Sequence, residues 1–124
     1  MFAPPDPASV LVTDVNGVRI VTVIGELDLA TRGPLEQELQ KVTDGASHLI
    51  IDLRRVTFID SGAIHALFKA GTKFDESRAF LLVEPGFVRR VLDIVEIDQV
   101  FSIESSLSEA MNRVGAELYE PWTS

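Results

Sequence analysis

Residues 49–64 read LIIDLRRVTFIDSGAI. The first five residues are an apolar run typical of a short central strand, because little of it is polar. A short loop follows, which we expect Phe58 and Ile59 to anchor in the core. The pair Asp60-Ser61 then stands where helical spacing begins, and both residue types are preferred at a helix N-cap. The stretch therefore predicts a buried strand, a loop and a helix that starts at this pair.

Upstream of this stretch, the sequence predicts a hairpin and a helix. Two β-branched runs, residues 10–15 and 18–24, flank Asn16-Gly17, a strong signal for a two-residue hairpin turn. Apolar residues then recur at helical spacing over residues 29–42, and an Asp-Gly pair ends that helix. Pro34 is compatible with this helix only in its first turn.

Downstream, helices and strands alternate. The expected elements are a helix at residues 61–73, a strand at 79–83, a helix after residues 84–86, an edge strand at 100–103 and a last helix with apolar residues from 107 to 114. Strands that alternate with helices after an opening hairpin predict an α/β domain. We expect a mixed β-sheet of about four to five strands covered by about four helices.

The length of 124 residues and the 46% hydrophobic content fit one globular domain. Prolines near the start predict a flexible tail over residues 1–9, followed by a domain over residues 10–116 and a C-terminal tail over residues 117–124.

Composition excludes several classes of function. The absence of cysteine excludes disulfides and thiolate chemistry, and a net charge of -8 with scattered basic residues argues against a general nucleic-acid binder. The longest run without Asp, Glu, Lys or Arg has eight residues, and no basic residue precedes Arg19. These features predict neither membrane insertion nor a signal peptide. We expect a cytoplasmic protein with no metal, no cofactor and no catalytic residues.

Ser61 has a structural and a functional interpretation. As an N-cap, a serine stabilises a helix by about 1 kcal/mol. If Asp60 caps instead, the Ser61 hydroxyl is presented to solvent at the positive end of the helix dipole, where a phosphate is tolerated. A phosphoserine adds about -1.5 to -2 charges, which would repel carboxylates of a bound partner.

Three more side chains are candidates for the same surface. His65 and Lys69 lie at i+4 and i+8 from Ser61, so they share its helix face and are placed to seat a kinase or the phosphate. Alternatively, both side chains are part of a solvent-exposed polar stripe on the helix and have no functional role. Asp28 stands at the start of the helix of residues 29–42, where a carboxylate is favourable to the dipole; functional involvement is equally weighted.

Residues 49–64, together with Gly25-Glu26-Leu27-Asp28, resemble the signature motifs of anti-sigma factor antagonists in the STAS domain family. The resemblance extends from residue 10 to residue 114 and implies the STAS fold. In this family, the unphosphorylated antagonist binds an anti-sigma factor that is also an ATP-using serine kinase, and binding releases the sigma factor. The kinase then phosphorylates the antagonist, and a metal-dependent phosphatase of the PP2C type restores it.

The resemblance therefore implies a non-enzymatic phosphoprotein in transcription regulation. Ser61 matches the phosphorylated serine, and Asp28 matches an aspartate near the partner surface. Together with the two residues on the helix face of Ser61, the expected partner-binding residues are Asp28, Asp60, Ser61, Gly62, His65 and Lys69. After Asp-Ser, family members usually have a small or hydroxyl residue, then Gly and Leu, whereas here the glycine lies one place early. This departure changes the backbone that a kinase approaches.

Two other classes fit the sequence less well. Asp52 ends the apolar run as an aspartate does in a receiver domain, but Asp14 lacks a second acid beside it and no lysine follows Lys73. The sequence also lacks a Gly-x-Ser-x-Gly elbow, a glycine-rich phosphate loop and a His-Glu-x-x-His motif, so an enzyme is not favoured.

The remaining alternative keeps the fold. STAS domains also serve as scaffolds in stress-signalling assemblies and as accessory subunits of lipid ABC transporters. Oligomer size would identify the first role, and co-purification with an ATPase would identify the second.

Overall fold

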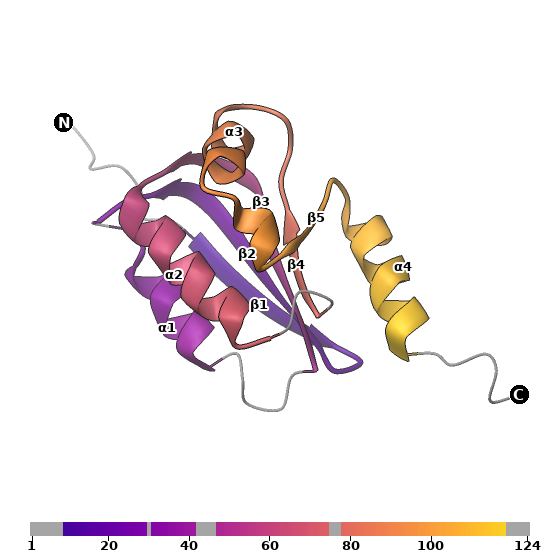
Figure 1. Ribbon diagram of the computed structural model, residues 1–124. Coiled ribbons are helices and arrows are strands. Elements are labelled where there is room, and N and C mark those ends of the chain that lie inside the picture. The colour runs from indigo at the N-terminus through magenta and orange to yellow at the C-terminus, as the bar shows by residue number, and fades with distance from the viewer. Residues whose placement is uncertain (1–8, 30, 42–46, 75–77, 119–124) are drawn as a thin grey trace, which may run out of the picture.

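A five-stranded sheet is built around the apolar run at residue 49. The computed structural model describes residues 9–29, 31–41, 47–74 and 78–118. In order across the sheet, the strands are β1 (Ser9–Val15), β2 (Val18–Leu27), β3 (His48–Ile59), β4 (Ala79–Leu82) and β5 (Ser102–Glu104) (Figure 1). β1 is antiparallel to β2, and the later neighbouring pairs are parallel. The predicted mixed sheet is confirmed.

Helices cover both faces of this sheet. α1 (Gly33–Lys41), α2 (Ser61–Thr72) and α3 (Phe87–Ile94) pack on one face, and α4 (Leu107–Leu118) packs on the other (Figure 1). A 3-10 turn (Ile97–Gln99) follows α3. Right-handed connections between successive parallel strands place consecutive helices on one face. None of the described helices is long and apolar enough to span a membrane.

The predicted hairpin is confirmed, and the first helix begins later than expected. Asn16 and Gly17 turn with φ of 50° and 82°, the left-handed conformation that a two-residue hairpin turn requires. α1 begins at Gly33 rather than at residue 29. Pro34 has no N–H to donate and fits only in a first turn, so it sets this start. Residues 42–46, where α1 is expected to end, lie outside the described residues, as do residues 1–8 and 119–124 of the expected tails.

β3 is longer than the predicted five-residue strand. Residues 54–59, expected as a loop, continue the strand to Ile59. They pair with the second half of β2, whereas the pairing of β3 with β4 ends at Asp52. Because this extension has a neighbouring strand on one side only, polar residues such as Arg55 and Thr57 are exposed. The extension therefore has the composition of a loop.

Asp52 consequently lies inside β3 and not at the end of a strand. Its carboxylate accepts hydrogen bonds of 2.9 Å from Nε and Nη2 of Arg54, and one of 3.0 Å from the Arg54 backbone N–H. Partial burial by itself raises the pKa of the Asp52 carboxyl, but the hydrogen bonds and charge of Arg54 outweigh it and lower that pKa below its ordinary value. The pair is a structural element of β3.

The Asp52–Arg54 pair should make stability depend on pH. A carboxyl with a lowered folded-state pKa stabilises the fold above its unfolded pKa, and this contribution is lost as the pH falls through the folded value. We expect Asp52→Asn to reduce the free energy of unfolding by about 1 kcal/mol at neutral pH and by less near pH 3, which lies below the ordinary pKa of an aspartate. Urea unfolding at both pH values measures this; an equal loss at both would contradict it.

A glycine with an unusual backbone conformation lies in β2 where its pairing with β3 is irregular. The register between the two strands shifts between residues 22 and 24 and again after Gly25. Gly25 has φ of 112°, a conformation that L side chains rarely adopt. Such irregularities bend a strand and increase its twist. Beyond the second register shift, Leu27 pairs with Ile59, so the two strands end together.

Replacing Gly25 should therefore destabilise the fold. We expect Gly25→Ala to lower the free energy of unfolding by at least about 1 kcal/mol, because a Cβ strains the backbone at positive φ. Gly115→Ala is the matched control: Gly115 lies in α4 with nothing within 4 Å of an added Cβ, so this change should be neutral or stabilising. If the two variants were equally stable in urea, Gly25 would not be required for its backbone conformation.

Candidate functional site

The two polar motifs of the chain meet where β2 and β3 end. Leu27 and Ile59 are the last paired residues of the two strands, and the N–H of Asp60 donates to the carbonyl of Leu27 at 3.0 Å. Asp28 follows directly after Leu27, and Ser61 follows directly after Asp60. The carboxyl ends of neighbouring parallel strands meet at one edge of a sheet, which is a common position for binding sites in α/β proteins. The structure thus brings the two motifs together.

Of the two candidate caps, Asp60 is the N-cap of α2. Its Oδ1 accepts a 2.9 Å hydrogen bond from the N–H of Ala63, and its carbonyl accepts from Ile64 at 3.0 Å. The carboxylate therefore satisfies a backbone donor that would otherwise lack a partner. Ser61 is the first residue of α2, and its side chain is exposed. The cap does not use the Ser61 hydroxyl, which stands at the positive end of the helix.

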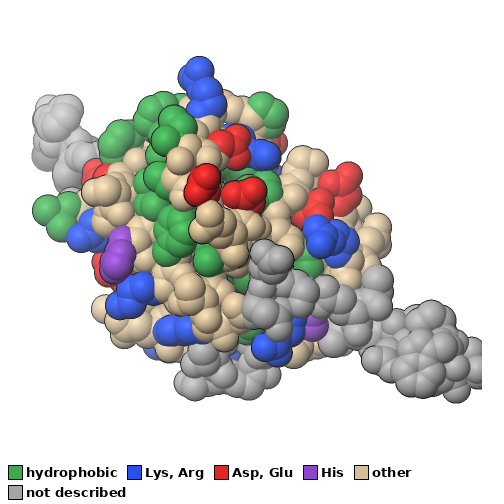
Figure 2. Space-filling model, in the orientation of Figure 1, with side chains coloured by type: hydrophobic (Ala, Val, Ile, Leu, Met, Phe, Trp, Pro, Cys, Tyr) green, Lys and Arg blue, Asp and Glu red, His purple; other side chains and the backbone are tan. Residues whose placement is uncertain are grey.

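The expectation that Phe58 and Ile59 both anchor this region in the core was wrong for Phe58. Ile59 is buried, whereas Phe58 is 40% exposed and Phe87 of α3 is 49% exposed. Their rings stack with centroids 6.1 Å apart at an interplanar angle of 11°. Adjacent residues of a strand point to opposite sides, and at this end of β3 only the side of Ile59 faces the core. Figure 2 shows hydrophobic side chains gathered over the region of α2 and α3.

Asp28 holds a turn rather than the start of a helix. Its Oδ1 accepts from the N–H of Thr31 at 3.1 Å, and its own N–H donates to Oγ1 of Thr31 at 3.0 Å. The Thr31 hydroxyl in turn donates to the carbonyl of Glu26. Since α1 begins only at Gly33, the prediction that Asp28 stands at a helix N-terminus is corrected. The reciprocal bonds give Asp28 a structural role and fix its place beside Asp60.

Arg32 is the site residue that the sequence reasoning missed. Its Nε donates to Oε1 of Glu36 at 3.1 Å, and its Nη1 lies 3.5 Å from Oδ1 of Asp60. A Cβ built on Gly62 would lie 1.5 Å from the same Nη1. The guanidinium therefore occupies the space beside the first turn of α2. An arginine shortly after the Asp28 motif, together with a glycine directly after Ser61, was the available signal.

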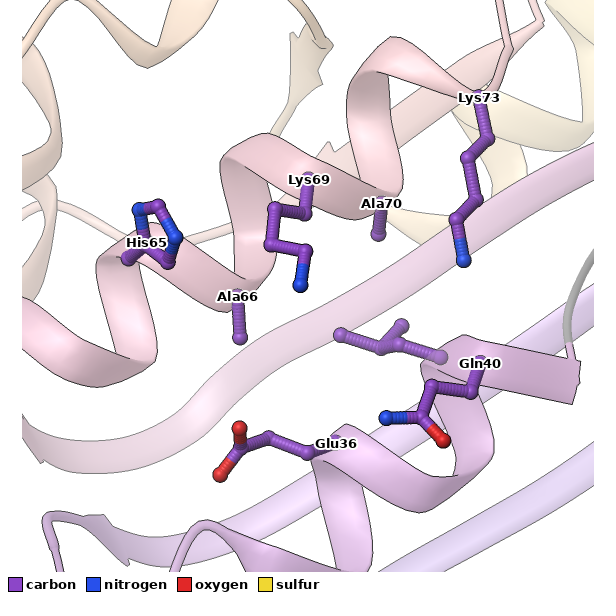
Figure 3. A pocket seen from close by; sticks show the side chains of 8 residues that line it. Glu36, Gln40, His65, Ala66, Lys69, Ala70 and Lys73 are labelled. Atoms are coloured by element: carbon purple, nitrogen blue, oxygen red, sulfur yellow. The ribbon is translucent and has the colours of Figure 1, made fainter.

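His65 and Lys69 line a groove between α1 and α2, further along the helix. Both are exposed, and the groove is completed by Lys73 and by Glu36 and Gln40 of α1. Figure 3 shows Lys69 and Lys73 extending from α2 toward α1. At 1.5 Å of rise per residue, Lys69 lies about 12 Å along the helix axis from Ser61. His65 is thus near the cluster at the helix start, and Lys69 belongs to the groove.

Among the described residues, no three His, Asp or Glu side chains are grouped so as to hold a metal ion. The chemistry that the arrangement offers is that of an exposed hydroxyl on a rigid helix start. Asp60 directly precedes this serine, and Arg32 lies between the carboxylates of Asp60 and Glu36.

Comparisons with known proteins agree with this geometry. The STAS domain family model matches residues 9–110. The anti-sigma-F factor antagonist RsfB of Mycobacterium tuberculosis is 35% identical over 115 residues, which cover 91% of this chain and 94% of that protein. A crystal structure of an anti-sigma factor antagonist from Mycobacterium paratuberculosis superimposes with a TM-score of 0.81 at 30% identity, covering 91% of this chain and 98% of that chain.

More distant structures share the fold. The anti-sigma factor antagonist SpoIIAA in its unphosphorylated form has a TM-score of 0.70 at 19% identity, over 86% of this chain and 96% of that chain. Bacillus SpoIIAA in the phosphorylated form has a TM-score of 0.66 at 18% identity, over 86% of this chain and 99% of that chain. Family match, identity and coverage lead to one assignment. The chain belongs to the STAS domain family, in which it is related to anti-sigma factor antagonists.

Proposed function

We propose that this chain is a cytoplasmic anti-sigma factor antagonist that is switched off by phosphorylation at Ser61. In its unphosphorylated form it binds an anti-sigma factor that is a serine kinase, and the sigma factor is released. The observation that carries the proposal is the separation of tasks at the start of α2. Asp60 caps the helix through Ala63, so the exposed Ser61 hydroxyl is available to a kinase. Similarity to RsfB, which is named an antagonist, supports the same function.

The chain contributes only the acceptor to the chemical step. The Ser61 Oγ attacks the γ-phosphorus of ATP on the kinase, the bond from that phosphorus to the ADP oxygen breaks, and the hydroxyl proton passes to a base of the kinase. A PP2C-type phosphatase later hydrolyses the phosphate ester. The antagonist has no catalytic group and no cofactor of its own in this cycle.

The phosphate acts at the partner surface and leaves the fold in place. The dipole of α2 favours negative charge at its first turn, and the cap does not depend on the modified hydroxyl. At a contact surface, however, the dianion loses water and repels facing carboxylates, which weakens binding. We assign the contact surface to Asp28, Asp60, Ser61, Gly62, His65 and Lys69.

Two substitutions at Ser61 separate the switch from the cap. Ser61→Ala leaves the Asp60 cap intact, so the free energy of unfolding should fall by less than about 1 kcal/mol. It should still bind the kinase-type anti-sigma factor of its own genome, in a complex that ATP no longer dissociates. Ser61→Asp adds one negative charge, so it should bind more weakly while folding equally well. Calorimetry for binding and urea unfolding for stability measure both.

The control for these variants is Asp60→Ala, which removes the cap and should cost about 1 kcal/mol of stability. The switch is refuted if Ser61→Asp binds as tightly as the unmodified protein and ATP releases Ser61→Ala normally. Stable association with a transporter ATPase, without binding to any kinase-type anti-sigma factor, would favour the role of transporter subunit instead.

The groove side of the surface has its own test. If Lys69 contacts the kinase, Lys69→Ala should weaken binding several-fold. Lys41→Ala removes the same charge from the exposed C-terminal end of α1 and should leave binding unchanged. Equal affinities of the two variants in calorimetry would confine the contact to the start of α2.

A further inference from the structure

The space beside Gly62 is filled by a guanidinium. An ideal Cβ on Gly62 would lie 1.5 Å from Nη1 of Arg32, 2.3 Å from Cζ and 3.0 Å from Nη2. No side chain larger than hydrogen is therefore compatible with this position of Arg32. The early glycine in the Asp-Ser-Gly sequence leaves room for this contact. Its consequence is a positive charge placed against the turn that carries Ser61.

The backbone on both sides keeps Arg32 in this place. Its N–H donates to the carbonyl of Asp28 at 3.0 Å, and its carbonyl accepts from the N–H of Glu36 at 2.9 Å. Its side chain is 23% exposed, so it is partly enclosed and still reaches solvent. The Asp28 turn and the first turn of α1 thus hold the root of the side chain, while Glu36 and Asp60 orient its head.

A phosphate on Ser61 would need such a cation. It would stand directly after the Asp60 carboxylate, and a helix dipole offsets only about half an elementary charge. Guanidinium groups bind phosphate well, because their planar fork of N–H donors matches the phosphate oxygens. Arg32 approaches the residues on both sides of Ser61, namely Asp60 and Gly62.

We infer that Arg32 is the counter-ion of phosphorylated Ser61, a positioning residue whose guanidinium turns from the Asp60 carboxylate to the phosphate oxygens. The inference rests on the proposed phosphorylation of Ser61. In the unmodified protein Arg32 balances Asp60, and in the modified protein it seats the phosphate against α2. Gly62 provides the room for both positions.

The test needs no kinase. Phosphoserine is placed at position 61 during translation, and its second pKa is measured by ³¹P NMR titration. A nearby cation favours the dianion, so the phosphoserine pKa should be higher in Arg32→Gln than in the parent protein, by roughly half a unit. Arg32→Lys, which keeps the charge without the fork, should restore part of the difference. Circular dichroism shows whether each variant is folded.

Two further variants serve as controls. Arg19→Gln removes the same charge near the opposite end of β2, roughly 25 Å away at 3.3 Å per residue, and should not change the phosphoserine pKa. Gly62→Ala keeps Arg32 but displaces its head, so it should raise that pKa less than Arg32→Gln does. Because the His65 imidazole lies one turn along α2 from Ser61, the series is repeated in a His65→Gln background.

The outcomes are distinct. An unchanged phosphoserine pKa in Arg32→Gln, or a change matched by Arg19→Gln, overturns the inference. The proposed switch at Ser61 would not be affected, because the binding experiments on the Ser61 variants test it separately. A shift specific to Arg32→Gln supports the inference even if no kinase for Ser61 is found. An unchanged pKa in Gly62→Ala would refute the role of the glycine in making room for Arg32.

Discussion

The hydrogen bond from the N–H of Asp60 to the carbonyl of Leu27 holds the site together. It lies where two parallel strands end, so the residues that follow on each strand leave the sheet side by side. One of them begins the Asp28 turn, and the other begins α2. Despite two register shifts, the second next to Gly25, β2 and β3 stay paired up to this point. Two motifs far apart in the chain thereby form one surface.

The start of α2 divides two tasks between neighbouring residues. Asp60 satisfies the backbone of the first turn, and Ser61 presents its hydroxyl to solvent. If one serine did both, a modification would remove the cap and loosen the helix. With the cap on the preceding residue, added charge changes the surface and leaves the helix in place. This arrangement suits a protein whose signal is read by a partner rather than by its own refolding.

Charge around the site is balanced locally in an otherwise acidic chain. The net charge is -8, yet Arg32 lies between Asp60 and Glu36, and the groove beside α2 carries two lysines. The stacked and exposed rings of Phe58, near the end of β3, and Phe87, at the start of α3, lie on the same part of the surface. The surface near Ser61 therefore combines an apolar pair, a cation and several carboxylates, a mixture typical of surfaces that recognise other proteins.

The sequence by itself determined the features that depend on neighbouring residues. The turn at Asn16-Gly17 and the start of α2 at Asp60-Ser61 were predictable, because backbone preference and side-chain capping act within a few residues. Which of the two residues caps α2 was left open by the sequence. Only the tertiary structure decided that residues 54–59 form a strand, since their partner is the distant end of β2. Arg32 was likewise beyond local patterns. Its position follows from the packing of α1 beside α2, which alone brings a guanidinium against Gly62.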